Sequence, residues 1–167
     1  MARRIPHSVG YPQSVTSVHA ALTDERYWRE RIAEVGGDNA RLDTLEIGDG
    51  TVSVEMEQAI PAEHLPSMVT KIRPGDLQIV RTESWGPLVG ERATGAVTAR
   101  VTGMPGELTG TVTLSASGTG SIVELDGEVL VPLPLIGGRI EAVIAERITE
   151  IFNHEDEFTA RWLSSRG

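Results

Sequence analysis

The clearest pattern of apolar and polar positions lies at the C-terminal end of the chain, between residues 131 and 164. It begins with a proline- and glycine-rich turn, Pro132–Gly138, and continues to Ser164 without another proline or glycine. Large apolar residues recur there at steps of three, four and seven: Ile140, Ile144, Ile148, Ile151, Phe158 and Trp162. This spacing predicts an amphipathic helix roughly 40 Å long. A broad surface must cover its apolar stripe.

From residue 40 to residue 131, apolar positions recur at every second residue, which is typical of strands. The alternation predicts strands at Arg41–Ile47, Thr51–Ile60, Leu77–Trp85, Arg92–Val101, Glu107–Ser117 and Ser121–Val131. Each has one apolar and one polar face, as strands do in antiparallel sheets that are covered on one side. The pair Asp126-Gly127 in the last strand is interpreted as a β-bulge. Segment 64–72 fits either a helical turn or a short edge strand.

The N-terminal part predicts a strand and two short helices. Residues Arg4–Val9 alternate weakly, a helix follows from Ser14 to Leu22, and Asp24 is placed to cap a second helix. This order predicts an α+β fold, in which an antiparallel sheet of about seven strands wraps around a long C-terminal helix, with two short helices after the first strand. The C-terminal helix is the only large apolar surface left to cover the inner face of the sheet.

Length, charge and composition narrow the class of protein. The 167 residues indicate a single domain, 1–167. The net charge of −9 argues against nucleic-acid binding, because an acidic surface repels phosphate. No apolar run approaches ~18 residues, so no stable membrane insertion is expected, and no apolar segment follows Met1–Arg4 as a signal peptide would require. The absence of cysteine fits a cytoplasmic protein. A monomer or a homodimer is compatible with the sequence.

Three segments carry a family resemblance: Ile5–Val9, the strand end Trp85-Gly86-Pro87, and the turn into the last helix, Val131–Glu141. With the order of elements, they resemble the START-like superfamily of lipid-transfer, Bet v 1-like and polyketide cyclase-like proteins, which have the helix-grip fold. More narrowly, nearly the whole chain resembles an actinobacterial family of single-domain proteins of unknown function, DUF2505. The superfamily resemblance implies a cavity between sheet and helix that holds a lipid-like or polycyclic molecule. It assigns no functional residue, because no motif of a particular branch is present.

The sequence offers few candidates for catalysis or metal binding. Its four histidines are not spaced as metal ligands, and it contains no P-loop, nucleophile elbow or dinucleotide-binding motif. We therefore assign no catalytic residue, no metal and no cofactor. Arg81 and Glu83 share a strand face with Trp85, and the pattern leaves open whether that face is buried. Glu155 falls on the stripe of the last helix, where we expect it to be paired or partly exposed.

The expected function is binding of a hydrophobic small molecule, lipid-, sterol- or polyketide-like, between sheet and helix. Small residues on the inner strand faces predict room there, unless they let the helix pack closer: Ala93, Gly95, Ala99, Gly110 and Ala116. The candidate cavity-lining residues are Met56, Met68, Arg81, Glu83, Trp85, Val97, Leu114, Val129, Ile144 and Ile148. The alternatives are a cyclase- or dehydratase-type enzyme that uses Arg81 or Glu83 in the same cavity, and an interaction protein without a cavity.

Overall fold

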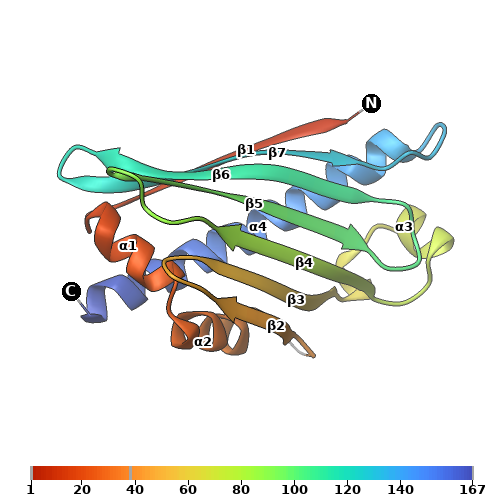
Figure 1. The fold of residues 1–167 in the computed structure, drawn as a ribbon. Helices are drawn as coiled ribbons and strands as arrows, with labels where there is room; N and C mark the ends of the chain where they lie inside the picture. Colours follow the sequence, from red (N-terminus) through yellow and green to blue (C-terminus); the bar gives the residue numbers. More distant parts are fainter. Residues whose placement is uncertain (1, 38, 167) are drawn as a thin grey trace.

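The computed structural model describes residues 2–37 and 39–166 of the chain. In this part of the chain a curved antiparallel sheet packs against one long helix, with shorter helices at its ends (Figure 1). The elements in chain order are β1 (Arg3–Tyr11), α1 (Val15–Leu22), α2 (Glu25–Val35), β2 (Arg41–Ile47), β3 (Val52–Ile60), the 3-10 turn η1 (Ala62–His64), α3 (Ser67–Ile72), β4 (Leu77–Trp85), β5 (Arg92–Val101), β6 (Glu107–Ser117), β7 (Gly120–Leu130) and α4 (Gly137–Arg166).

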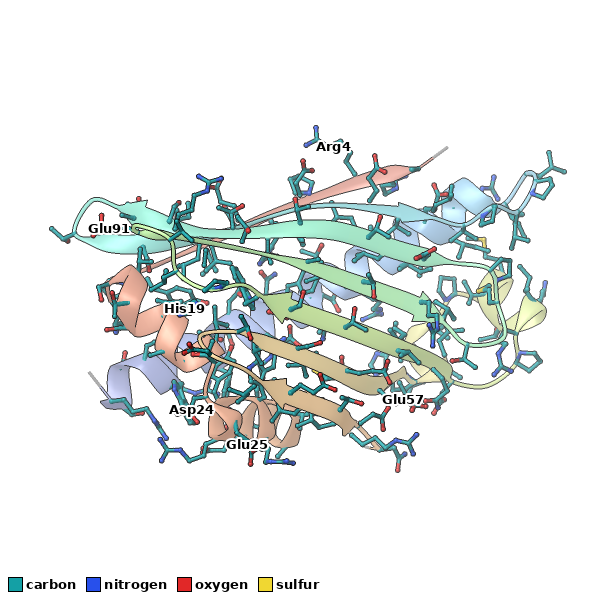
Figure 2. The ribbon with its side chains drawn as sticks, in the orientation of Figure 1. Arg4, His19, Asp24, Glu25, Glu57 and Glu91 are labelled. Carbon is teal, nitrogen blue, oxygen red and sulfur yellow. The ribbon has the colours of Figure 1, made fainter. Side chains whose placement is uncertain are left out.

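The seven strands are arranged in the order β1-β7-β6-β5-β4-β3-β2. The first strand therefore pairs with the last one. Every other pair of neighbouring strands in the sheet is also consecutive in the sequence. Helix α4 runs along the concave face, and charged side chains such as Arg4, Glu25 and Glu91 project outward (Figure 2). The predicted helix-grip architecture is confirmed.

The alternating pattern located the strands well, but the predicted β-bulge in the last strand was wrong. No bulge occurs at Asp126-Gly127, because the pairing of β7 with β6 and with β1 runs through both residues without a shift. An extra residue would have moved Leu125 and Val129 to opposite faces, whereas both are buried. The shift in register lies instead in β2, between Leu42 and Thr44. In segment 64–72, which the sequence left open, residues Ser67–Ile72 form helix α3.

Helix α4 covers the inner face of the sheet, largely with the predicted stripe. Ile140, Ile144 and Ile148 are buried, but Ile151 is only half-buried and Phe152 takes its place. The reason is geometric: four residues turn an α-helix by slightly more than one turn and three by slightly less, and here the step of four keeps the side chain on the sheet side. Glu141 in the first part of the helix is also buried, where it accepts a hydrogen bond from the backbone N of Val131 at 2.8 Å.

Helices α1 and α2 cover one end of the sheet, beside the C-terminal half of α4 (Figure 1). Ser14 and Asp24 cap them by accepting hydrogen bonds from backbone N–H groups in the first turn, and the cap at Asp24 was predicted. The two helices bury Tyr27 and Trp28 completely, and the Trp28 indole donates to the carbonyl O of Leu22 at 2.7 Å. The Trp28 hydrogen bond fixes α2 to α1, and Tyr27 fixes α2 to α4 through Thr159 and Trp162.

Candidate functional site

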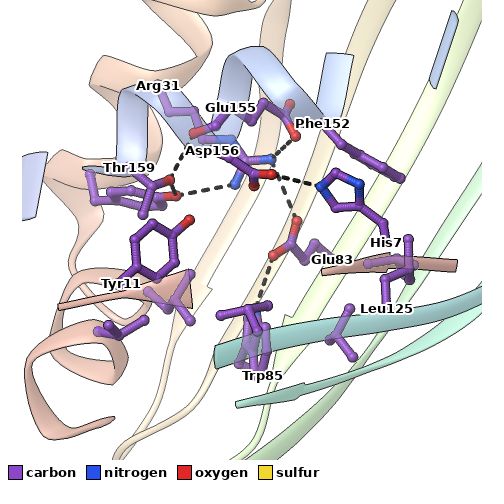
Figure 3. A pocket seen from close by; sticks show the side chains of 16 residues that line it. His7, Tyr11, Arg31, Glu83, Trp85, Leu125, Phe152, Glu155, Asp156 and Thr159 are labelled. Carbon is purple, nitrogen blue, oxygen red and sulfur yellow. Dashed lines mark hydrogen bonds and ion pairs between the residues drawn. The ribbon is translucent and has the colours of Figure 1, made fainter. Parts of the chain in front are cut away.

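A cavity of about 80 Å3 lies between the sheet, helix α1 and the C-terminal half of α4 (Figure 3). Its walls differ in chemistry. One wall is aliphatic and comes from the sheet and α1: Val18, Leu22, Val97, Val112, Val123 and Leu125. The rest of the lining carries hydrogen-bonding and ionisable groups from β1, α2, β4 and α4: His7, Tyr11, Tyr27, Arg31, Glu83, Glu155, Asp156 and Thr159.

A buried ion cluster forms the deep part of the polar wall. Both terminal nitrogens of Arg81 donate to Glu155, at 2.6 and 3.1 Å, and Arg31 Nη2 lies 2.6 Å from Glu155 Oε1. Arg81 also donates to Gln58 at 2.7 Å. Burial by itself would raise the pKa of Glu155, but Arg31 and Arg81 lower it to about 2. Glu155 is therefore a carboxylate held by two arginines.

Glu83 belongs to the same cluster but is held less tightly. It accepts a hydrogen bond from the Trp85 indole at 2.9 Å, and its other oxygen lies 3.5 Å from Arg31 Nη2. The formal charges of Arg31, Arg81, Glu83 and Glu155 cancel, as buried charges generally require.

A chain of hydrogen bonds connects this cluster to the helix backbone. Thr159 donates its hydroxyl to the carbonyl O of Glu155 at 2.9 Å, and the Tyr27 hydroxyl lies 2.6 Å from the Thr159 hydroxyl. Because Thr159 uses its only proton on Glu155, Tyr27 must be the donor to Thr159. Arg31 Nη1 then donates to the Tyr27 oxygen at 3.4 Å. Burial raises the pKa of Tyr27, so the phenol keeps the proton that this chain needs.

The rim of the cavity is formed where β1 faces α4. His7 Nε2 lies 2.6 Å from Asp156 Oδ2, both side chains are partly exposed, and the imidazole packs against the Phe152 ring. Tyr11, further along β1, points its hydroxyl toward Thr159 (Figure 3). Burial, reinforced by the charge of Asp156, raises the pKa of Tyr11 well above its ordinary value, so Tyr11 remains a protonated phenol.

Comparison with known proteins places the chain in a family. Residues 6–163 match the family model described as a protein of unknown function, DUF2505. The chain belongs to the DUF2505 family. It is also 33% identical to an uncharacterized protein of Mycobacterium tuberculosis, over 99% of each chain.

The fold of this DUF2505 protein is shared with more distant solved structures. Norcoclaurine synthase from Thalictrum flavum aligns with a TM-score of 0.57 at 13% identity, over 98% of this chain and 94% of that one. A START superfamily protein from Mycobacterium smegmatis aligns with a TM-score of 0.53 at 10% identity, over 98% and 99% of the two chains. At these identities the likeness establishes the START-like fold. The DUF2505 and START-like resemblances of the sequence are therefore confirmed.

The cavity of the DUF2505 protein brings together only some of the residues proposed from the sequence. Glu83, Trp85 and Val97 line it, and Arg81 lies behind it, bonded to Glu155. The other six lie elsewhere. Val129, Ile144 and Ile148 surround a separate void of about 10 Å3, Met56 and Leu114 are buried in the core, and Met68 is half-buried on α3.

The small residues on the inner strand faces do not mark the cavity. None of the five lines it, and Ala99 borders only the void of about 10 Å3. Around Ala99, helix α4 therefore packs close to the sheet, which agrees with the alternative that small residues let the helix pack closer. Ala116 is exposed rather than inward-facing in the core, because the β6–β7 hairpin extends beyond α1 and no helix in residues 2–37 and 39–166 covers its tip (Figure 1).

The structure settles two questions and adds residues that sequence reasoning missed. The face of β4 that carries Arg81 and Glu83 is buried, and Glu155 is both buried and paired. Arg31 was missed, although it lies four residues after Tyr27 and three after Trp28, on the buried face of α2. For the other missed residues, the sequence gives no signal that they meet at one cavity: His7, Tyr11, Asp156 and Thr159.

Two findings concern features that the structure does not contain. Among residues 2–37 and 39–166, no three His, Asp or Glu side chains are grouped so that they could hold a metal ion. In the same part of the chain, no helix combines the length and the apolar character that a membrane span requires.

Proposed function

We propose that this DUF2505 protein binds a hydrophobic small molecule, lipid-, sterol- or polyketide-like, between the sheet and α4. The observation that carries the proposal is the cavity itself, which has an aliphatic wall from the sheet and α1 and a few fixed polar groups from β1, α2, β4 and α4. That combination is typical of small-molecule sites, in which apolar surface supplies affinity and convergent polar groups fix orientation. The START-like fold of the distant relatives is compatible with the same role.

The volume of the cavity sets a condition on this function. About 80 Å3 is well below the ~300–1,000 Å3 of typical ligand sites, so a lipid or sterol needs additional space. The side between β1 and α4 is where the structure can provide it. Strand β1 is an edge strand whose neighbour in the sheet is β7, so if these two strands swing away from α4 together, side-chain contacts such as His7–Asp156 break and the β1–β7 hydrogen bonds are kept.

Ligand binding can be followed at the indole N–H resonances of the tryptophans. Trp85 lines the cavity and donates to Glu83, whereas Trp28 donates to Leu22 and Trp162 lies outside the cavity. We expect a fatty acyl, sterol or polycyclic ligand with a Kd below ~100 μM to shift the Trp85 resonance in 1H–15N spectra more than the other two.

A matched pair of variants on β6 tests whether the ligand uses this cavity. Val112→Phe places a phenyl ring in the cavity. Thr111→Phe places the same ring one residue earlier on β6, on the exposed outer face of the sheet. Val112→Phe should abolish binding and Thr111→Phe should leave it intact, provided that circular dichroism shows both to be folded. Equal affinity of the two variants, or a Trp85 resonance that does not move, would show that the ligand binds elsewhere.

A cyclase- or dehydratase-type activity is the second candidate. It is favoured by the His7–Asp156 pair at 2.6 Å and by the buried Glu83, because all three line the cavity and carry groups that can transfer protons. Mass spectrometry of a bound ligand recovered after incubation separates the two functions: a binding protein returns the compound unchanged, and an enzyme returns a product of cyclisation or water loss. If neither a ligand nor a product is found, the remaining alternative is an interaction protein.

A further inference from the structure

One hydrogen-bond donor in the cavity wall has no partner. The Nε–H of Arg31 is buried and makes no hydrogen bond to any group in residues 2–37 and 39–166. Both terminal nitrogens of this guanidinium have partners: Nη2 pairs with Glu155 and Glu83, Nη1 donates to the Tyr27 hydroxyl, and the group lies over the Trp28 ring at 4.7 Å. A buried donor without an acceptor is costly, and Arg31 lines the cavity, so an acceptor atom of a ligand that widens the cavity toward this nitrogen would satisfy it.

Tyr11 provides a second donor on the same cavity. Its hydroxyl points toward Thr159 (Figure 3), whose oxygen accepts from Tyr27, donates its own proton to Glu155 and keeps one lone pair that Tyr11 can use while the cavity holds no ligand. The Tyr11 phenol is buried and protonated, and it can donate to an oxygen atom placed in the cavity.

We propose that the polar end of the ligand is a neutral carbonyl oxygen, as in a ketone, ester or quinone, which accepts hydrogen bonds from Arg31 Nε–H and the Tyr11 hydroxyl. The inference rests on the proposed binding function and names the chemical class of the ligand. The carbonyl lies against the polar wall, and the hydrocarbon part lies against the valines and leucines of the sheet and α1.

The charges around the cavity favour a neutral acceptor over an anion. A ligand carboxylate would lie beside Glu83, Glu155 and Asp156, which all line the cavity, while the one arginine in its wall is already paired with Glu155. An unpaired buried charge is strongly disfavoured.

A ligand ammonium group fits no better. It could reach a carboxylate, but it would leave the Arg31 donor without an acceptor and would add a cation beside Arg31 and Arg81. Only a neutral acceptor satisfies the free donor without adding charge.

Four probes with the same bicyclic skeleton test the inference: 1-indanone, indane, indane-1-carboxylate and 1-aminoindane. Dissociation constants are measured at pH 7 from the Trp85 indole resonance. We expect 1-indanone to bind about five- to a hundredfold more tightly than indane, the gain that two hydrogen bonds typically give. The carboxylate and the protonated amine should both bind more weakly than indane.

Variants then assign the preference to the two donors. Tyr11→Phe should reduce the advantage of 1-indanone over indane by about threefold without weakening indane itself. Arg31→Lys keeps a positive charge for Glu155 but removes the Nε–H, and it should reduce the same advantage. The carbonyl stretching band of bound 1-indanone should lie at lower frequency in the natural protein than in Tyr11→Phe. Thr149→Val, which removes a hydroxyl of α4 bonded to Ala145 outside the cavity, should change none of these values.

The outcomes separate this inference from the binding function. If indane, the carboxylate or the amine binds as tightly as 1-indanone, or if Tyr11→Phe leaves the ratio unchanged, the carbonyl inference is wrong and the binding function stands. If Arg31→Lys does not fold, the Tyr11→Phe ratio and the infrared band decide the question. If neither the four probes at ~1 mM nor the larger lipid and polycyclic ligands shift the Trp85 resonance, both proposals are wrong.

Discussion

Replacing Glu155 by Gln perturbs the centre of the buried ion cluster with the smallest change in shape. The natural carboxylate accepts two hydrogen bonds from Arg81 and pairs with Arg31, and all three side chains are buried. Gln keeps one oxygen acceptor but removes the negative charge. Arg31 and Arg81 then retain only Glu83 and the Gln58 amide as compensating groups.

The size of the effect follows from the pKa of Glu155. That pKa is lowered from 4.5 to about 2, and each unit corresponds to about 1.36 kcal/mol, so ionised Glu155 contributes about 3 kcal/mol to the free energy of unfolding. Breaking a buried ion pair by removing one partner costs a similar amount, roughly 3–5 kcal/mol. We therefore expect Glu155→Gln to lower the free energy of unfolding by about 3 kcal/mol at pH 7.

The pH dependence gives a sharper test than the value at one pH. Because the pKa of Glu155 is lower in the folded state, its contribution is fully present above about pH 4.5 and is lost as the pH falls toward 2. Urea unfolding followed by tryptophan fluorescence should therefore give a constant difference between the natural protein and Glu155→Gln from pH 7 to 5. The difference should shrink steadily below pH 4.5.

A control on the same helix distinguishes this mechanism from a general effect of removing charge. Glu150 is exposed and pairs with Arg147 at the surface, so Glu150→Gln should change stability by less than about 0.5 kcal/mol at any pH. A Glu155→Gln difference below about 1 kcal/mol at pH 7, or one that does not vary with pH, would refute the assignment of Glu155 as an ionised, doubly paired carboxylate.

Two further predictions concern packing, and both are read from thermal and urea unfolding. Ile148→Ala should cost about 2–5 kcal/mol because Ile148 is buried, whereas Ile151→Ala at a half-buried position should cost clearly less; equal losses would contradict the observed orientation of α4. Gly95→Ala should destabilise by about 1–3 kcal/mol or more, because the added Cβ would lie 1.9 Å from the backbone O of Ser84. Gly138→Ala in α4, whose Cβ meets nothing within 4 Å, should stabilise by about 0.4–1 kcal/mol, and a loss there would contradict the open surroundings of that glycine.

The sequence by itself determined the elements and their order. The strand bounds at Arg41–Ile47 and Leu77–Trp85, the helix start near Ser14, the cap at Asp24 and the long last helix were all predicted, because each depends on spacing and end signals within a few neighbouring residues. The packing of the sheet around α4 was also predicted from the sequence, since no other apolar segment was large enough to cover the inner face of the sheet.

Only the tertiary structure decided what the site contains. Alternation along β4 puts Arg81 and Glu83 on one face, but whether that face is buried depends on α2 and α4, which pack against it from distant parts of the chain. Glu155 lies 74 positions from Arg81, and His7 lies 149 positions from Asp156. A buried charge is stable only beside its partner, and no local pattern records where that partner lies. The position of the cavity has the same origin: it is where side chains from β1, α1, α2, the sheet and α4 fail to fill the space between them.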